Sequence, residues 1–212
     1  LELRDVEVRN PSGSQLIESL SLRLEPGDSL VITGPSGCGR TTLLRSIALL
    51  WPYATGTVRH PDHGGDAMFL SQVPYLPLGD LRAVLSYPSR ETGIADDRLT
   101  AALEDVTLGH LSNRLNETQD WSKTLSPGEQ QRIAFARVLL HQPKVIYFDE
   151  STSALDPGNE YALYRLVTTR LPGSILVSVT HRDSVKQHHN FHLHLTGDGG
   201  WTFKPEPASA DV

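Results

Sequence analysis

Residues 34–42 have the types and spacing of a loop that binds phosphate groups. An apolar run at residues 29–33 precedes them, and residues 43–50 follow with apolar side chains at helical spacing. Glycines in such a loop let successive backbone N–H groups point inward, and the N-terminus of the next helix adds partial positive charge. This cradle would accept a triphosphate, with the Thr41 hydroxyl on Mg²⁺. The candidate residues are Gly34, Pro35, Ser36, Gly37, Cys38, Gly39, Arg40, Thr41 and Thr42.

Arg40 stands where this loop pattern normally has lysine. Lysine is a compact charge on a flexible stem, whereas arginine is a longer planar fork, so the exchange is not conservative beside crowded phosphates. We expect nucleotide binding to be retained, though weakened, and hydrolysis to be slow. Equal turnover by this chain and by its Arg40→Lys variant would contradict that expectation.

A pair of acidic residues follows the continuous apolar run at residues 145–148. Such a run is typical of a parallel strand buried on both faces. Asp149 and Glu150 would then lie at the carboxyl end of the strand, where nucleotide sites form on parallel sheets. Asp149 is a candidate Mg²⁺ ligand through bound water, and Glu150 could polarise the water that attacks the γ-phosphate. The alternative is an acidic pair that merely opens a loop.

Two further polar residues follow apolar strands in the same manner. A second buried strand at residues 175–179 leads to Thr180 and His181, and a short strand at residues 67–70 leads to Gln72. His181 is a candidate contact to the γ-phosphate, and the amide of Gln72 can bind Mg²⁺ or water. The candidate catalytic residues are therefore Glu150, His181 and Gln72, and the candidate metal ligands are Thr41, Gln72 and Asp149.

The remaining elements are expected from hydrophobic periodicity and from turn residues. Residues 1–8 and 19–24 alternate as strands of an antiparallel sheet, residues 191–195 and 201–203 form a hairpin, and residues 116–124 are expected to be a loop. Asp80 can cap a helix that begins at residue 81. Further helices are expected over residues 43–50, 94–115, 127–140 and 157–171.

Composition places the chain among ordinary globular domains. It has 212 residues, 38% of them hydrophobic and 21% charged, with a net charge of −6. The acidic balance argues against a nucleic-acid binder, and a single cysteine suits a reducing compartment. No apolar run is long enough to span a membrane. The chain begins at Leu1 in strand-like alternation, without Met, so we expect a domain cut from a longer polypeptide.

The candidate motifs occur together and in a fixed order over residues 1–203. After the phosphate loop and Gln72, residues 125–129 read LSPGE, residues 145–150 read VIYFDE, and residues 153–156 read SALD before Thr180 and His181. This set resembles the nucleotide-binding domain of an ATP-binding cassette (ABC) transporter. The resemblance implies an α/β P-loop NTPase with a mainly parallel core sheet, an N-terminal antiparallel β subdomain and an α-helical signature subdomain at about residues 80–142. Residues 204–212 would form a flexible tail.

The resemblance also implies roles for residues that local patterns do not explain. The family forms a head-to-tail dimer that sandwiches two ATP molecules, so Ser126, Gly128 and Glu129 would contact the γ-phosphate held by a second copy. Asp156 would lie in the loop that crosses the dimer interface, with Glu150 as the base and His181 as the switch histidine. The family motif is usually LSGGQ; proline is tolerated at a helix start, and Glu129 adds negative charge near the phosphates.

The implied function is ATP hydrolysis coupled to transport across a membrane. A transmembrane domain would be fused upstream of Leu1, so that membrane association runs through that domain only, on the cytoplasmic face of a bacterial inner membrane. Residues 49–52, 72–82 and 87–88 resemble subfamily D half-transporters and bacterial relatives that move peptides or cobalamin. The loop at residues 72–81 would meet the coupling helix of the membrane domain. The family usually places an aromatic residue under the adenine ring, in the first β segment. The matching residues 8–11 contain no aromatic side chain, so Arg9 or Asn10 would lie under the adenine.

Three alternatives remain open from the sequence. A regulatory cassette could use ATP only to hold a dimer together; Arg40 and the missing aromatic residue keep this alternative open, whereas Glu150 and His181 argue against it. A DNA-repair or chromosome-organising ATPase shares the motifs but separates them by a long coiled coil, which this chain does not have. His192 and His194 fall on one face of a predicted strand and could bind a metal, but the sequence favours a solvated strand end over a metal site.

Overall fold

The structure is a computed structural model that describes residues 1–61, 66–89 and 93–205. The chain divides into two compact units, and each is described by itself. The first unit comprises Leu1–Phe69, Pro143–Glu150 and Gly173–Val212, and the second comprises Leu70–Gln142 and Ser151–Pro172.

The main sheet of the first unit has six strands in the order β11-β10-β3-β9-β8-β5. Strands β10, β3, β9 and β8 run parallel, and β11 pairs antiparallel with β10. Every residue of β3, β8 and β9 is buried, as the apolar runs predicted. The mainly parallel core sheet is therefore confirmed. The strands are β3 (Ser29–Thr33), β5 (Ala67–Leu70), β8 (Val145–Asp149), β9 (Ile175–Val179), β10 (Phe191–Leu195) and β11 (Trp201–Pro205).

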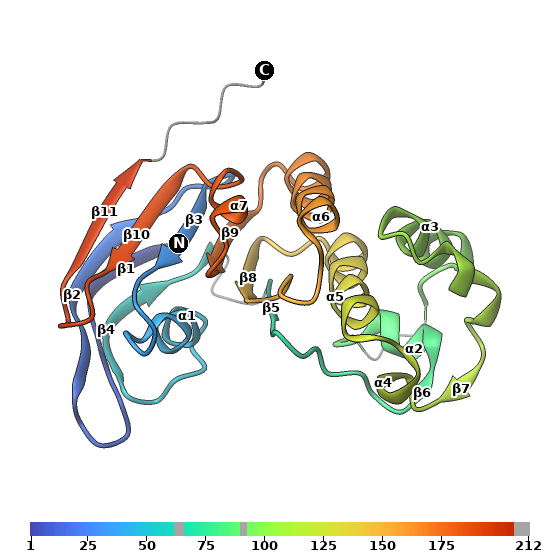
Figure 1. The fold of residues 1–212 in the computed structure, drawn as a ribbon, viewed down its shortest axis with the longest axis horizontal. Coiled ribbons are helices and arrows are strands. Elements are labelled where there is room, and N and C mark those ends of the chain that lie inside the picture. The colour runs from blue at the N-terminus through green and yellow to red at the C-terminus, as the bar shows by residue number, and fades with distance from the viewer. Residues whose placement is uncertain (62–65, 90–92, 206–212) are drawn as a thin grey trace. The chain divides into compact units, whose positions relative to one another are not determined.

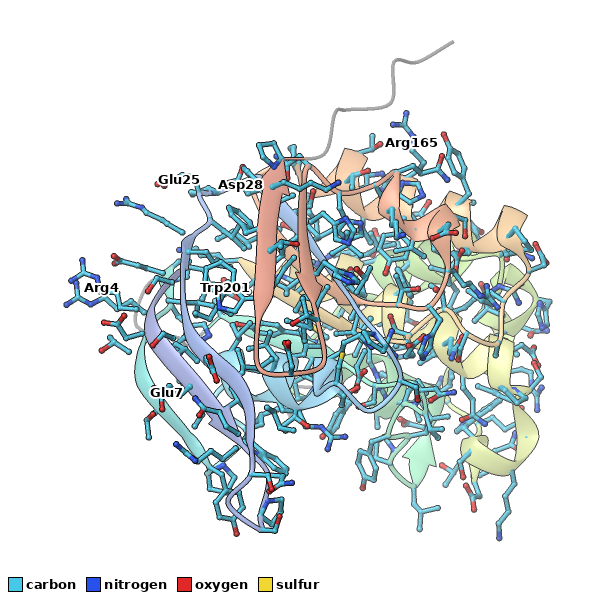
Figure 2. All side chains as sticks on the ribbon, turned by 60° about the vertical axis from the view of Figure 1, so that its left-hand side comes forward. Arg4, Glu7, Glu25, Asp28, Arg165 and Trp201 are labelled. Atoms are coloured by element: carbon cyan, nitrogen blue, oxygen red, sulfur yellow. The ribbon has the colours of Figure 1, made fainter. Side chains whose placement is uncertain are left out.

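A second sheet in the same unit is antiparallel and has the order β2-β1-β4. Its strands are β1 (Glu2–Arg9), β2 (Gln15–Arg23) and β4 (Ala54–Arg59), which confirms the predicted N-terminal β subdomain. The Trp201 indole nitrogen donates to the Glu18 carbonyl oxygen at 2.8 Å, which ties the β10–β11 hairpin to β2 (Figure 2). This hydrogen bond holds the hairpin against the antiparallel sheet of the first unit.

Helix α1 (Arg40–Ile47) packs against β1 on one side and against β8 and β9 on the other (Figure 1). Leu43, Leu44 and Ile47 enter a core shared with the buried residues of both sheets. The predicted helix extended to residue 50, but α1 ends at Ile47 because Leu49 adopts a left-handed backbone with φ of 62°. The unit also contains the short helix α7 (Asp183–Lys186).

The second unit is mainly helical and is organised around α5, which packs against α2, α3 and α6 (Figure 1). Asp80 caps α2 by accepting from the Ala83 backbone N–H at 2.8 Å, as predicted. Two short strands, β6 (Gly79–Asp80) and β7 (Thr118–Gln119), form a separate antiparallel pair. The helices are α2 (Leu81–Ser86), α3 (Asp96–Asp105), α4 (Trp121–Thr124), α5 (Pro127–His141), α6 (Pro157–Arg170) and a 3₁₀ helix at Gly109–Arg114.

Two predicted elements of this unit are wrong. The single helix expected over residues 94–115 is broken, because Thr107 adopts φ of 61° between α3 and the 3₁₀ helix. The segment 116–124, expected to be a loop, contains β7 and α4. Trp121 explains the second difference: its side chain is fully buried under the Arg114 guanidinium, and its indole nitrogen donates to the Glu117 carbonyl at 3.2 Å.

Strand β11 continues through Pro205, so residues 204 and 205 of the predicted tail belong to the hairpin. The rest of that tail lies outside the described residues. Among the helices that the structure describes, none combines the length and the apolar character that a membrane span requires.

Candidate active site

The phosphate loop lies between β3 and α1, and its backbone depends on glycine. Gly39 precedes α1 in a left-handed conformation with φ of 99°. Gly34 has φ of 153°, and a Cβ there would lie 2.6 Å from the Leu195 carbonyl oxygen and 2.7 Å from Cys38 Sγ. No acidic residue occupies the first turn of α1, so no carboxylate there would repel an anion from the N–H groups at the start of the helix. The loop has the geometry of a phosphate cradle.

A cavity of about 370 Å³ adjoins this loop, lined by Ser36, Cys38, Thr196 and Asp198 among others. Asp198 accepts hydrogen bonds from the Thr196 hydroxyl and from the Gly200 backbone N–H. These hydrogen bonds hold the pKa of the Asp198 carboxyl below its ordinary value. The lone cysteine is buried in the loop, where it serves as a small packing residue.

Thr41 and Asp149, two of the predicted metal ligands, contact each other. The Thr41 hydroxyl donates to Asp149 Oδ1 at 2.9 Å, and Asp149 lies at the end of the fully buried strand β8. A hydroxyl and a carboxylate at this separation are oxygen donors of the kind that Mg²⁺ prefers, and Mg²⁺ usually keeps several waters as well. The two residues therefore fit the predicted ion.

Three other candidate residues form a chain of contacts in the same unit. Glu150 Oε1 lies 3.2 Å from His181 Nε2. The Arg40 guanidinium approaches the same imidazole, with Nη1 at 3.1 Å from Nδ1 and Nη2 at 2.9 Å from Nε2, and Nη1 lies 3.4 Å from the Thr180 carbonyl oxygen. Arg40 is 8% exposed, whereas the His181 side chain is 61% exposed. The loop cation, the candidate base and the candidate switch histidine are thus one cluster.

Glu150 is held in an unusual environment for a carboxylate. Its backbone is left-handed, with φ of 51°, and its N–H donates to the Val179 carbonyl at 3.1 Å. Burial raises the pKa of the Glu150 carboxyl, and the charges of His181 and Arg40 oppose that rise. A strained, partly desolvated carboxylate with a raised pKa is suited to accept a proton from water.

The signature residues belong to the second unit, at the start of α5. Ser126 and Glu129 form a capping box: the Glu129 N–H donates to Ser126 Oγ at 3.2 Å, and Glu129 Oε1 accepts from the Ser126 N–H at 3.0 Å. The hydrogen bond from the Ser126 backbone holds the pKa of Glu129 below its ordinary value. The carboxylate of Glu129 is therefore used within its own helix turn, a role that the amide oxygen of glutamine can also fill.

Gln131 joins the other candidate residues of this unit. Its Nε2 donates to the Gln72 carbonyl at 2.8 Å and to Ser153 Oγ at 3.1 Å, and its Oε1 accepts from the Ala154 N–H at 2.9 Å. A Cβ on Gly128 would lie 3.3 Å from the Ala154 carbonyl oxygen, so this glycine allows close packing of the same loop. The segment after Gln72, the signature helix and the segment 153–154 are thus connected through one amide.

Asp156 caps the next helix of the second unit. Its Oδ1 accepts from the Asn159 N–H at 2.9 Å at the start of α6, and hydrogen bonds from Asn159 lower the pKa of the Asp156 carboxyl. The predicted site residues consequently fall into two sets. The phosphate loop with Asp149, Glu150 and His181 belongs to the first unit, and Gln72, Ser126, Gly128, Glu129 and Asp156 belong to the second.

Sequence reasoning missed two features of these sets. Gln131 was not predicted, because it lies within the polar run Glu129–Arg132 and local pattern does not distinguish it from its neighbours. Trp51 and Tyr53 pack edge to face at 5.6 Å, and both bond to Arg9: the Trp51 indole donates to the Arg9 carbonyl, and the Arg9 N–H donates to the Tyr53 carbonyl. Aromatic side chains therefore do lie beside the segment 8–11, supplied by a different part of the chain.

His192 and His194 share a hydroxyl group. Thr33 Oγ1 lies 2.5 Å from His192 Nε2 and 3.1 Å from His194 Nδ1. Within the described ranges, no group of three or more His, Cys, Asp or Glu side chains is arranged to hold a metal ion. The pair is thus engaged in hydrogen bonding along the sheet.

Known sequences resemble this chain over most of its length. A sequence model described as ABC transporter matches residues 17–153. An uncharacterized ABC transporter ATP-binding protein of Haemophilus influenzae is 44% identical over 198 residues, covering 93% of this chain and 33% of that protein. ATP-binding cassette sub-family D member 3 of Homo sapiens is 37% identical over 207 residues, covering 94% of this chain and 31% of that protein.

A plant protein, ABC transporter D family member 2, chloroplastic, of Arabidopsis thaliana, is 36% identical over 244 residues, covering 92% of this chain and 34% of that protein. The chain therefore spans about a third of the length of these curated relatives.

Proposed function

This chain belongs to the ABC transporter family, and we propose that it is the ATP-binding and ATP-hydrolysing domain of a transporter. The observation that carries the proposal is the cluster in the first unit, where Thr41 contacts Asp149 at 2.9 Å and His181 contacts Glu150 at 3.2 Å beside a glycine loop. A phosphate cradle, a pair of metal-ligand oxygens and a carboxylate with a raised pKa are the parts that hydrolysis of a triphosphate requires.

Each residue has a defined task in this proposal. Backbone N–H groups of the loop and the Arg40 guanidinium bind the phosphates, and Thr41 and Asp149 would hold Mg²⁺. When bound, Mg²⁺ would offset phosphate charge and help to orient the triphosphate. Glu150 orients the attacking water and accepts its proton. His181, whose side chain is mostly exposed, contacts the γ-phosphate.

We further propose that two copies of the chain complete each other's sites. The start of α5 presents backbone N–H groups and the Ser126 hydroxyl, which form a second anion cup. That cup would bind the γ-phosphate held by the partner copy, with Gly128 and Glu129 shaping it and Asp156 in the loop that crosses the interface. Each nucleotide would then be enclosed only when two chains meet.

The partner that moves substrate would be a transmembrane domain. The ATP-binding domain would then act at the cytoplasmic face of a membrane. Val73, Tyr75 and Leu78 in the segment after Gln72 are 76%, 63% and 77% exposed. Large apolar side chains this exposed in one short segment suggest a protein interface. We propose that this segment contacts the coupling helix of the transmembrane partner, and that ATP-driven pairing is transmitted there.

The test is ATP turnover measured beside ATP-induced dimerisation of the purified chain. We expect Mg²⁺-dependent phosphate release, and a loss of about 10²- to 10⁴-fold in kcat for Glu150→Gln, the usual range for removal of a general base. Glu104→Gln, an exposed position on α3, is the matched control and should leave kcat unchanged. Ser126→Ala should weaken dimerisation seen by light scattering with ATP.

Two outcomes would contradict parts of the proposal. Dimerisation with ATP but without turnover would favour the regulatory cassette over the hydrolase. Turnover and dimerisation that are both insensitive to Ser126→Ala would refute the shared site.

A further inference from the structure

The contact between Arg40 and His181 joins residues that are 141 positions apart in the sequence. Arg40 lies at the start of α1, and His181 follows β9 after Thr180. The Arg40 side chain is buried and is anchored by the Thr180 carbonyl oxygen, 3.4 Å from Nη1. A buried, anchored guanidinium holds its N–H groups in fixed directions, unlike an exposed one.

The imidazole lies between a group that can only donate and one that accepts. Guanidinium carries no acceptor, so any hydrogen bond between Arg40 and His181 must use an unprotonated ring nitrogen. The carboxylate of Glu150 accepts, so its contact with Nε2 at 3.2 Å requires a proton on that nitrogen. The tautomer with the proton on Nε2 satisfies two of the three contacts: the Nε2–H donates to Glu150, and Nδ1 accepts from Arg40 Nη1 at 3.1 Å. The tautomer with the proton on Nδ1 satisfies only the third, in which Nε2 accepts from Arg40 Nη2 at 2.9 Å.

We propose that Arg40 is a positioning residue for His181. By donating to Nδ1, it fixes the imidazole as the Nε2–H tautomer and directs that proton at Glu150 while the loop holds no phosphate. The inference rests on the proposed function only for its consequence, since the proposed base and switch histidine are then aligned before nucleotide arrives.

Arginine is suited to this task in a way that lysine is not. The planar fork places Nη1 within reach of both the Thr180 carbonyl and the imidazole, and Nη2 alongside the ring. Lysine offers a single ammonium on a flexible stem, so it cannot hold the carbonyl and the ring in fixed relative directions. These contacts give a structural reason for arginine at position 40, where the loop pattern usually has lysine.

The experiment reads the tautomer directly. Two-bond ¹H–¹⁵N correlation spectra are recorded for the full chain with ¹⁵N-labelled histidine, without nucleotide and at about pH 8.5, where an ordinary imidazole is neutral. The His181 signals are assigned by their loss in His181→Gln. We expect wild type to show one tautomer with the proton on Nε2. Arg40→Lys, which keeps the charge, should convert His181 to a mixture of tautomers.

Arg45→Lys is the matched control, because Arg45 is an exposed arginine on the same helix. It should leave the His181 signals as they are in wild type. A wild-type His181 with its proton on Nδ1 would overturn the proposal without any variant, as would an unchanged Nε2–H tautomer in a folded Arg40→Lys protein. ATP binding is measured separately: its absence would refute the proposed function, whereas the tautomer result stands independently of nucleotide.

Discussion

His189 provides a pH-dependent test of the segment that follows the candidate switch histidine. The imidazole is only 3% exposed; its Nδ1 donates to the Val185 carbonyl at 2.8 Å, and its Nε2 accepts from the Ser178 hydroxyl at 2.8 Å. Both contacts suit the neutral ring. Burial lowers the pKa of His189 from the ordinary 6.5 to about 4. The segment after His181 is thereby fastened to β9 by a group that resists protonation.

The sign of the effect follows from proton uptake. Above pH 6.5 the ring is neutral in the folded and the unfolded chain, so its protonation does not alter stability. Between pH 6.5 and about 4 the unfolded chain binds a proton that the folded chain does not, so the free energy of unfolding falls as the pH falls. A shift of this size corresponds to about 3 kcal/mol over the whole window, a large share of a typical domain's stability.

The assay is urea unfolding at several pH values across this window, for wild type and for His189→Gln. We expect the stability of His189→Gln to depend less steeply on pH, by about 3 kcal/mol across the window. His110→Gln is the control for loss of an exposed imidazole, because the His110 side chain is 62% exposed whereas His189 is buried. Equal slopes for wild type and His189→Gln would refute the reasoning.

Three further substitutions test the two sets of site residues. Asp149→Asn should reduce Mg²⁺-dependent turnover by about 10- to 100-fold, as expected for an outer-shell metal contact, and unchanged Mg²⁺ titration curves would contradict the assignment. Gln131→Met keeps the side-chain volume but removes three hydrogen bonds, so urea unfolding should show a loss of about 2–3 kcal/mol. Stability within about 0.5 kcal/mol of wild type would count against it. Gly34→Ala would place a Cβ 2.6 Å from a backbone oxygen, so a lowered Tm and weaker nucleotide binding are expected; an unaltered Tm would exclude the predicted clash.

The parts of the fold that could be predicted are those that depend on local pattern. The apolar runs at β3, β8 and β9 are buried on both faces. A continuous apolar run predicts a strand of this kind without knowledge of the rest of the chain. Helix α5 begins at Pro127 and is capped by Ser126 together with Glu129, so the residues that define its start lie within four consecutive positions. Local chemistry alone determines such features.

The errors occur where tertiary packing decides. Residues 94–115 have helical periodicity throughout, yet Thr107 adopts a left-handed backbone between the two helices. Residues 116–124 are polar in composition, yet Trp121 is fully buried and organises a helical turn around itself. A helix end and a buried side chain within a polar segment depend on neighbours that local periodicity does not specify.

The candidate site shows the same division. The order of the motifs predicted that Thr41 and Asp149 share a site, because the carboxyl ends of parallel strands meet at one edge of the sheet. It did not predict that Arg40 reaches His181, since that contact depends on the length and direction of one buried side chain. Nor did it predict that Gln131 connects Gln72 with the segment 153–154.

The distribution of tryptophan gives each unit its own spectroscopic reporter. Trp51 and Trp201 belong to the first unit, whereas the fully buried Trp121 under the Arg114 guanidinium belongs to the second. A chain that carries Trp51→Phe and Trp201→Phe would therefore fluoresce from the helical unit alone. Its emission, compared with far-ultraviolet circular dichroism along one denaturant series, would show whether the nucleotide-cradle unit and the signature unit melt as one cooperative body or in separate steps.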